Sequence, residues 1–229
     1  MPIFQLTRAI SFPDPAWAEP GGLLAVGGDL RPERLLAAYR NGIFPWYSEG
    51  EPLLWWSPDP RFVLFTAEFR AHHSLRRVVR SGRFEVTFNR DFRGVVVGCR
   101  TAPRRGQAGT WITPEMLDAY TALHAAGHVQ SVEVWRDGRL AGGLYGVVVG
   151  RCFCGESMFA RERDASKVGL VRLVQTLRKL GSPLVDCQVP TGHLATFGAR
   201  EIPRVHFLAL LREIAAQPAL RLPQAPDGD

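Results

Sequence analysis

Apolar and polar residues alternate most regularly in the second half of the chain. "TPEMLDAYTALHAAG" carries apolar residues at helical spacing, with Thr113 placed to cap the first turn and Gly127 to end the helix. "SVEVW", "RLAGGLYGVVVG" and "RCFCGESMF" predict strands, and "RDG" predicts a hairpin turn between the first two. A helix from about Ala165, a strand in "PLVDCQV" and a last helix around His206 to Ala216 follow. The order α-β-β-β-α-β predicts a mixed α+β fold around one sheet.

The first part of the chain differs in composition. From Phe12 to Pro60 it is dense in Pro, Gly and Trp, which predicts turns and loops clamped by aromatic side chains. One helix is predicted in "RPERLLAAYRNG", with Pro32 in its first turn and Gly42 just past its end. Beyond this unit, strands "RFVLF" and "RFEVTFN" flank a basic helix, "AHHSLRRVVRSG". We therefore expect a small N-terminal domain over residues 1–60 and a larger domain over residues 61–229.

Composition narrows the class of protein. With 46% hydrophobic and 22% charged residues, the 229-residue chain is typical of globular proteins with their own core. No apolar run reaches the roughly 20 residues that a membrane helix needs, and no signal peptide is apparent, so a cytoplasmic location is expected. The cysteines Cys99, Cys152, Cys154 and Cys187 lack the paired spacing of a zinc site. We expect reduced thiols and no bound metal.

The positive charge is unevenly distributed. A net charge of +6 favours an acidic partner, and many arginines fall in the basic helix and just after it. Arg76, Arg77, Arg80 and Arg83 are the densest group. Two interpretations fit this group: a solvated helix face, or a surface that contacts the phosphate backbone of a nucleic acid.

Several familiar catalytic motifs are missing from the sequence. It contains no P-loop and no dinucleotide-binding glycine pattern. Ser157 lies in "GESMF", which lacks the second glycine of a nucleophile elbow. Cys187 and His193 could suggest a thiol enzyme. However, Val185 and Val189, two residues to either side of Cys187, favour a cysteine packed in the core.

One polar pair on a strand is a better candidate for chemistry. In an extended "VDCQV", Asp186 and Gln188 share one face, opposite Cys187, and would look into a cleft if that opposite face packs under a helix. An exposed edge strand is the plain alternative. The same alternation places Glu156 between Cys154 and Met158, an unfavourable site for a charge unless a cation approaches it. A salt bridge from Glu156 to a nearby arginine is the alternative there.

The sequence also resembles a known family over almost its whole length. From Phe12 to about Leu211 it is similar to the bacterial leucyl/phenylalanyl-tRNA–protein transferases, in the blocks "GGLLAVGGDL", "AYRNGIFPW", "LLWWSPDPR", "GTWIT", "AYTALHAAGH", "SVEVW", "GGLYGVVVG", "FCGESMF", "ASK", "DCQ", "HLATFGA" and "EIPR". The resemblance implies a small N-terminal domain joined to a domain with the acetyltransferase-like (GNAT) mixed sheet. It implies transfer of Leu or Phe, with Met a further candidate, from aminoacyl-tRNA to the α-amino group of proteins that begin with Arg or Lys. The product would be an N-end-rule degradation signal.

The resemblance also implies a role for each candidate residue. Gln188 would position the attacking amine, Asp186 or the substrate ribose and water would take up the proton, and Glu156 would bind the cationic side chain of the acceptor. The pocket for the transferred amino acid would be formed by Leu144, Phe153, Met158, Leu170, Leu173 and Val185. Trp46 and Trp111 would stack on the terminal adenosine, and Arg76, Arg77, Arg80 and Arg83 would hold the tRNA backbone. No cofactor or metal is implied, and we expect a monomer.

The sequence departs from the family pattern at a few positions. Ala160 stands where a serine is expected, and Leu144, Leu173 and Val185 are slimmer than the usual side chains. The preference between Leu and Phe is therefore left open.

Two other functions compete with this interpretation. An acetyl-CoA-dependent N-acetyltransferase would need a Q/R-x-x-G-x-G/A loop that opens a helix, and the nearest segment, "PRRGQA", has Pro103 at the first position. A non-catalytic RNA-binding module would account for the arginines and tryptophans but would not explain the paired Asp186 and Gln188.

Overall fold

The computed structural model describes residues 3–102 and 111–223. The "PRRGQA" segment lies outside these residues, as does most of the C-terminal "LPQAPDGD", for which disorder was predicted from the composition. Leu222, the first residue of that stretch, is buried, and its backbone N–H donates to the Gln130 side chain. The end of the described chain is thus packed on the sheet through Leu222.

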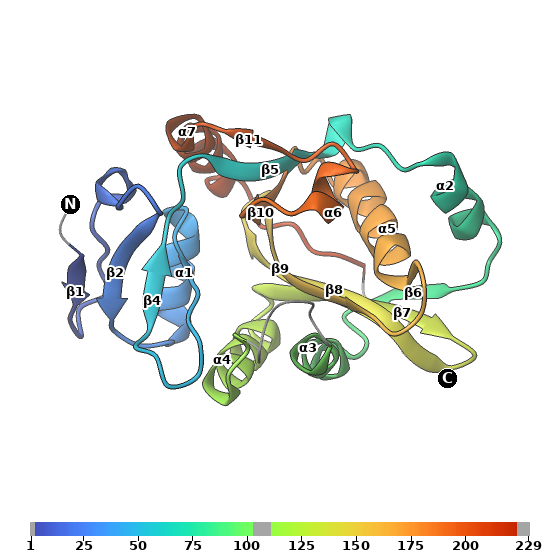
Figure 1. Ribbon diagram of the computed structural model, residues 1–229, viewed down its shortest axis with the longest axis horizontal. Coiled ribbons are helices and arrows are strands. Elements are labelled where there is room, and N and C mark those ends of the chain that lie inside the picture. Colours follow the sequence, from blue (N-terminus) through green and yellow to red (C-terminus); the bar gives the residue numbers. More distant parts are fainter. Residues whose placement is uncertain (1–2, 103–110, 224–229) are drawn as a thin grey trace.

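Residues 4–56 form a small four-stranded sheet covered by one helix (Figure 1). Its strand order is β1 (Phe4–Leu6), β2 (Leu23–Gly27), β4 (Leu54–Trp56), β3 (Phe44–Pro45), and α1 spans Pro32–Arg40. A short 3-10 helix, η1, spans Pro15–Trp17. The helix is as predicted, with Pro32 at its start and Gly42 at φ +69° after its end. For the rest of this unit only turns and loops were predicted, and the four strands were missed. Strands of two to five residues are too short to show a period of two in the sequence.

The larger sheet has seven strands. Their order is β11 (Arg200–Ile202), β5 (Arg61–Phe65), β10 (Leu184–Gln188), β9 (Cys152–Ala160), β8 (Arg139–Val149), β7 (Val129–Arg136), β6 (Glu85–Phe88). Neighbouring strands are antiparallel except β9 and β10, which are parallel and joined by α5 (Ala165–Lys179). The predicted α+β fold with its α-β-β-β-α-β order is confirmed.

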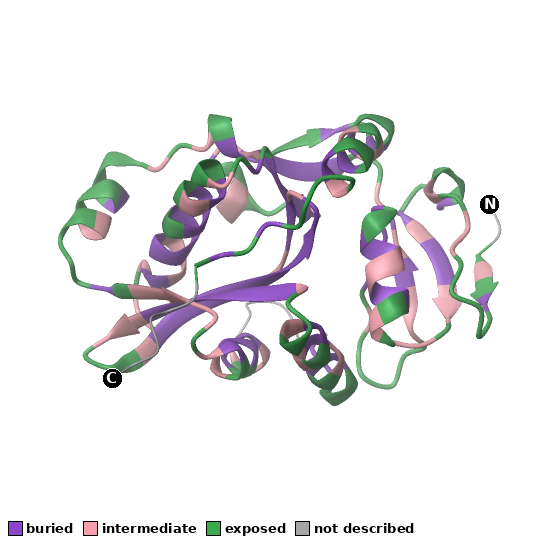
Figure 2. Ribbon diagram, turned by 180° about the vertical axis from the view of Figure 1, so that it is seen from behind, coloured by how far each residue is buried: buried purple, intermediate pink, exposed green. Residues whose placement is uncertain are grey.

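Helices cover both faces of this sheet (Figure 1). On one face, α3 (Phe92–Thr101), α4 (Pro114–Ala125) and α7 (Arg204–Ala215) share a core with α1. On the other lie α5, α2 (His73–Arg80) and the short α6 (Gly192–Ala195) and η2 (Thr66–Glu68). Buried residues concentrate along the central strands and the inner helix faces (Figure 2). The small unit therefore packs into the same core as the larger sheet, through α1.

The sequence pattern did not reveal α3. Its N-cap is Asp91, whose carboxylate accepts from the Gly94 N–H at 2.9 Å. Three consecutive valines, residues 95–97, favour a strand by composition, and the arginines on either side do not produce a helical pattern of apolar positions.

Two β-bulges shape the centre of the sheet. On β9 the pairing shifts so that Glu156 is the extra residue between Gly155 and Ser157, and on β10 Cys187 is the extra residue between Asp186 and Gln188. Each bulge reverses the facing of the residues beyond it. The predicted alternation along "FCGESMF" is therefore wrong: Phe153 and Phe159 lie in cores on opposite faces of the sheet.

Candidate active site

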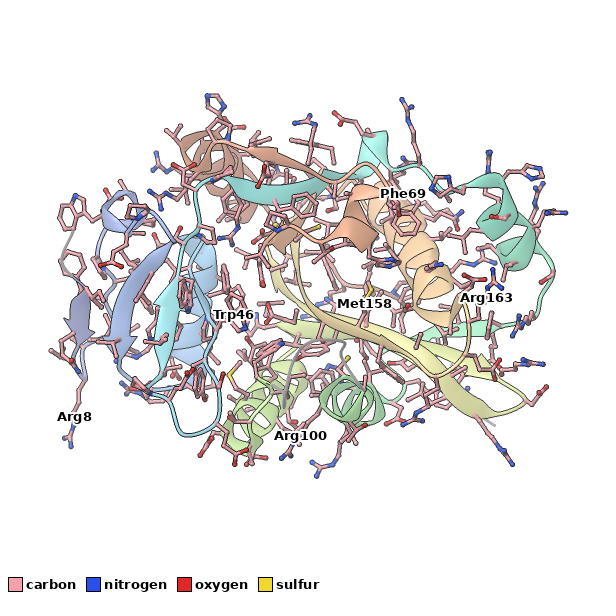
Figure 3. All side chains as sticks on the ribbon, viewed as in Figure 1. Arg8, Trp46, Phe69, Arg100, Met158 and Arg163 are labelled. Atoms are coloured by element: carbon pink, nitrogen blue, oxygen red, sulfur yellow. The ribbon has the colours of Figure 1, made fainter. Side chains whose placement is uncertain are left out.

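The residues predicted for the amino-acid pocket lie together. Leu144, Phe153, Met158, Leu170, Leu173 and Val185 all line one hollow of about 290 Å³. The hollow lies where the pairing of β9 with β10 stops, beyond Cys154 and Asp186, and α5 forms its other wall. Met158 lies between the sheet and α5 (Figure 3). Cys187, His193 and Leu194 also line this hollow and were not predicted there.

A second hollow adjoins the first. It measures about 320 Å³ and contains both predicted tryptophans, Trp46 and Trp111, together with Phe44 and Pro45. Trp46 is 38% exposed, so an aromatic face is available to a ligand (Figure 3). Glu156 and Gln188 line both hollows. A molecule in one hollow would therefore meet a molecule in the other at these two side chains.

Glu156 is the centre of a hydrogen-bonded cluster at this junction. The Tyr39 hydroxyl donates to its Oε1 at 2.8 Å, the Tyr120 hydroxyl to its Oε2 at 3.1 Å, and Gln188 Nε2 to Oε1 at 2.9 Å. Burial raises the pKa of Glu156 to about 7, against the lowering effect of these three donors. The expected position between Cys154 and Met158 is wrong because Glu156 is the bulge residue. Among the described residues, no arginine forms a salt bridge with it.

The two tyrosines come from different parts of the chain. Tyr39 is on α1 and Tyr120 on α4, and their buried hydroxyls also contact each other, with either able to donate. Because each hydroxyl carries only one proton, the three contacts among Tyr39, Tyr120 and Glu156 are all hydrogen bonds only when Glu156 is protonated. Burial and the Glu156 charge raise the pKa of both phenols well above the ordinary value, so both remain neutral donors. Each sits in an apolar helical pattern, where the sequence could only suggest a core residue.

Asp186 lies behind the cleft, and the prediction that it looks outward into it is wrong. Its side chain is 1% exposed and forms a bidentate ion pair with Arg61, from Nε to Oδ1 at 2.8 Å and from Nη2 to Oδ2 at 2.7 Å. Arg61 lies on β5, the neighbour of β10 in the sheet. Only Gln188 of the predicted pair lines the hollows, because the bulge at Cys187 separates the two side chains.

The thiols in and near the hollow are poor nucleophiles. Cys187 is buried, and burial with the nearby Asp186 charge raises its pKa far above the usual range. Cys152 and Cys154 are also buried, with their sulfurs 3.9 Å apart. Within residues 3–102 and 111–223, no cluster of His, Cys, Asp and Glu could hold a metal ion.

The predicted arginine group is exposed on and beside α2. Arg76, Arg77 and Arg80 are on the helix, and Arg83 follows it and pairs with Glu162 at 3.1 Å. Arg77 and Arg83 line a hollow of about 570 Å³ with Arg163 and Lys167. Figure 1 shows α2 at the opposite end of the molecule from the small sheet. A ligand that touches both α2 and Trp46 must therefore be long.

The fold and the site together define a class of enzyme. Two hollows that meet at a Glu–Gln pair suit a transferase that brings an activated acyl group to an incoming nucleophile. The buried, strongly shifted Cys187 does not suit a covalent intermediate on sulfur. The chemistry indicated is direct transfer between two bound substrates.

Comparison with known proteins identifies the family. The sequence model of the leucyl/phenylalanyl-tRNA protein transferases matches residues 63–212, and that of their N-terminal domain matches residues 28–59. The chain is 58% identical to the leucyl/phenylalanyl-tRNA–protein transferase of Anaeromyxobacter sp. (strain K), over 96% of this chain and 95% of that one. The enzyme of the same name from Stutzerimonas stutzeri (strain A1501) is 59% identical over 88% and 90%. The chain belongs to the leucyl/phenylalanyl-tRNA–protein transferase family and is an aminoacyltransferase.

Solved structures resemble it only loosely. A ribosomal-protein-alanine N-acetyltransferase from Brucella melitensis aligns with a TM-score of 0.35 and 13% identity, over 48% of this chain and 82% of that one. Among the described residues, no helix has the length and apolar character to cross a bilayer.

Proposed function

We propose that this enzyme transfers Leu or Phe from aminoacyl-tRNA to the α-amino group of proteins that begin with Arg or Lys, which marks them for degradation. Family membership supports the donor and the reaction. The observation that carries the acceptor is the partly buried carboxylate of Glu156 at the junction of the two hollows.

The first hollow suits the transferred side chain. Its wall is built of aliphatic, aromatic and thioether groups, and Met158 can adjust its shape to a branched or a planar side chain. Leu and Phe would fill the apolar part of this space. The ester carbonyl would then lie near Gln188, and the terminal adenosine near Trp46 and Trp111 in the second hollow.

Glu156 suits a cationic acceptor. Its pKa of about 7 means that the carboxylate is only partly ionised at neutral pH, and an incoming guanidinium or ammonium group favours the ionised form. Three donors already hold the carboxylate in place, so the acceptor meets a fixed partner. An uncharged first residue would leave that charge uncompensated.

The reaction needs no nucleophile from the enzyme. The acceptor nitrogen attacks the ester carbonyl carbon, the C–N bond forms, and the bond from that carbon to the ribose oxygen breaks. In net terms one proton passes from the amine nitrogen to the ribose oxygen. An α-amino group titrates near pH 8, so a useful fraction is neutral at working pH. Gln188 positions the amine, and ribose hydroxyl or water carries the proton, because Asp186 is buried and both of its oxygens already accept from Arg61, one of them also from the Gln188 backbone N–H.

The remaining contacts would be to the tRNA backbone. The exposed arginines of α2 favour phosphate contacts that do not read sequence. Because aminoacyl-tRNA is a cytoplasmic substrate, we place the enzyme in the cytoplasm.

A series of matched peptides tests the acceptor. Peptides that differ only in the first residue are offered with leucyl-tRNA: Arg, Lys, norleucine as the uncharged counterpart of Lys, and N-acetyl-Arg. We expect leucine to reach the Arg and Lys peptides, little to reach norleucine, and none to reach the blocked amine. Equal modification of the Lys and norleucine peptides would contradict a role for the Glu156 charge.

A further inference from the structure

Arg61 is an almost completely buried charged residue near the site. Its side chain is 1% exposed, and its guanidinium lies over the rings of Phe44 and Phe207, 4.9 Å and 4.6 Å from their centroids. Its donors are directed at two acceptors: Nε and Nη2 at the Asp186 carboxylate, and Nη1 at the Gly42 carbonyl oxygen at 3.0 Å. Removing this side chain would leave a buried carboxylate without a counter-ion.

The Asp186 contact bears directly on Gln188. Asp186 Oδ1 accepts from both Arg61 Nε and the Gln188 backbone N–H, the latter at 3.0 Å. Gln188 adopts φ +64°, a left-handed conformation that a residue with a side chain rarely holds without support. Its side chain then reaches Glu156 Oε1. The direction of the Gln188 amide therefore depends on where the Asp186 carboxylate is held.

The Gly42 contact bears on a second donor to the Glu156 carboxylate, Tyr39, which shares Oε1 with Gln188. Gly42 follows the end of α1, the helix that carries Tyr39, and the Tyr39 hydroxyl donates to Glu156. One guanidinium group thus ties together the segments that carry two of the three donors to Glu156. No other described arginine bonds to both segments.

We propose that Arg61 is a positioning residue for the transfer reaction: through Asp186 it fixes the backbone of Gln188, and through Gly42 it fixes the end of α1, so that the Gln188 amide and the Tyr39 hydroxyl meet at Glu156. Asp186 then acts as the anchor of this arrangement and does not exchange a proton during transfer. The inference rests on the proposed function, since it assigns how Gln188 is placed for that reaction.

The first test compares two conservative substitutions of buried arginines. Arg61→Lys keeps the positive charge but removes the planar guanidinium group that donates to both Asp186 and Gly42. Arg34→Lys is the matched control, because Arg34 is also fully buried and paired with a carboxylate, Asp29, within the small sheet unit. Transfer of leucine from leucyl-tRNA to an Arg-initiated peptide is measured as kcat and as KM for each substrate.

The two variants should separate clearly. We expect Arg61→Lys to lower kcat about 10- to 100-fold, as a small displacement of a positioned group does, with KM for leucyl-tRNA little changed. Arg34→Lys should keep the wild-type kcat. A wild-type kcat in folded Arg61→Lys would overturn the inference while leaving the function intact, whereas no transfer by the wild type would refute the function itself.

A second variant decides the case even if Arg61→Lys does not fold. Asp186→Asn keeps the oxygen that accepts from Gln188 but has no carboxylate to take up a proton. The ionisable groups around the Arg61–Asp186 pair are Cys187 beside Asp186 on β10 and Cys152, Cys154 and Glu156 on β9. We expect kcat to fall while its pH profile keeps every limb of the wild-type profile, with the Glu156 limb moved to lower pH, because the Asp186 charge that helps to raise the Glu156 pKa is gone. Loss of one limb of the profile in Asp186→Asn would show that Asp186 exchanges a proton and would overturn the inference.

Discussion

Replacement of Glu156 by glutamine should stabilise the folded protein above neutral pH while it weakens selection of the acceptor. Glu156 is held in a partly buried position by Tyr39, Tyr120 and Gln188. Glutamine has nearly the same shape and can still accept hydrogen bonds from the tyrosines, but it carries no charge at any pH. The substitution therefore isolates the effect of burying the charge.

The size of the effect follows from the pKa. The pKa of Glu156 rises from 4.5 to about 7 on folding, so the folded state holds this proton more tightly than the unfolded state. Each pH unit between these values corresponds to about 1.4 kcal/mol, which gives about 3 kcal/mol as an upper value. Because the folded state binds more protons in this window, the contribution of Glu156 favours folding below pH 4.5 and is lost as the pH rises to 7.

Urea denaturation at several pH values measures this contribution. At pH 8 the Glu156→Gln variant should be more stable than the wild type by about 1–3 kcal/mol, and the difference should shrink as the pH falls to 5. Glu213→Gln, an exposed change on α7, serves as the control and should show no such trend. A difference between wild type and Glu156→Gln that is the same at pH 5 and pH 8 would refute the reasoning.

Three further predictions concern the substrates. Leu173→Phe fills part of the 290 Å³ hollow, so kcat/KM should fall more for phenylalanyl-tRNA than for leucyl-tRNA; an equal fall would contradict the assignment of the hollow. Trp111→Ala should raise KM for aminoacyl-tRNA by about 5- to 150-fold, the equivalent of roughly 1–3 kcal/mol of base stacking, and an unchanged KM would argue against stacking. Replacing Arg77 and Arg80 together by Ala should lower the slope of log K against log salt for tRNA binding by about 2, whereas Arg212→Ala on α7 should leave it unchanged.

The order of the helices and strands in the larger domain, and the residues that line the 290 Å³ hollow, could be predicted from the sequence. Periodic patterns are strong in α4, where the Thr113 cap agrees with the apolar stripe, and in α5, and both helices form where they were predicted. The pocket residues came from the family resemblance, and the strands and helix that carry them bring all of them to one place.

Other parts of the site depend on contacts between distant segments. Arg61 and Asp186 are 125 residues apart, and Tyr39 and Glu156 are 117 apart, so no local pattern links either pair. The bulges at Glu156 and Cys187 also escaped prediction, since a strict alternation was applied through both strands. The bulge at Cys187 reverses the facing of Gln188 beyond it, so Gln188 and Asp186 do not share a face as expected. Asp186 keeps the face opposite Cys187, where it is buried by its ion pair with Arg61.

The central claim is direct transfer of an aminoacyl group at the junction where Gln188 meets Glu156. The most direct measurement incubates the wild type and Gln188→Ala with leucyl-tRNA and an Arg-initiated peptide and sequences the peptide product by mass spectrometry. The account predicts one leucine added before the Arg by the wild type, and a much slower appearance of the same product with Gln188→Ala. A folded wild-type enzyme that leaves the peptide unmodified, or a Gln188→Ala variant that works at the wild-type rate, would contradict it.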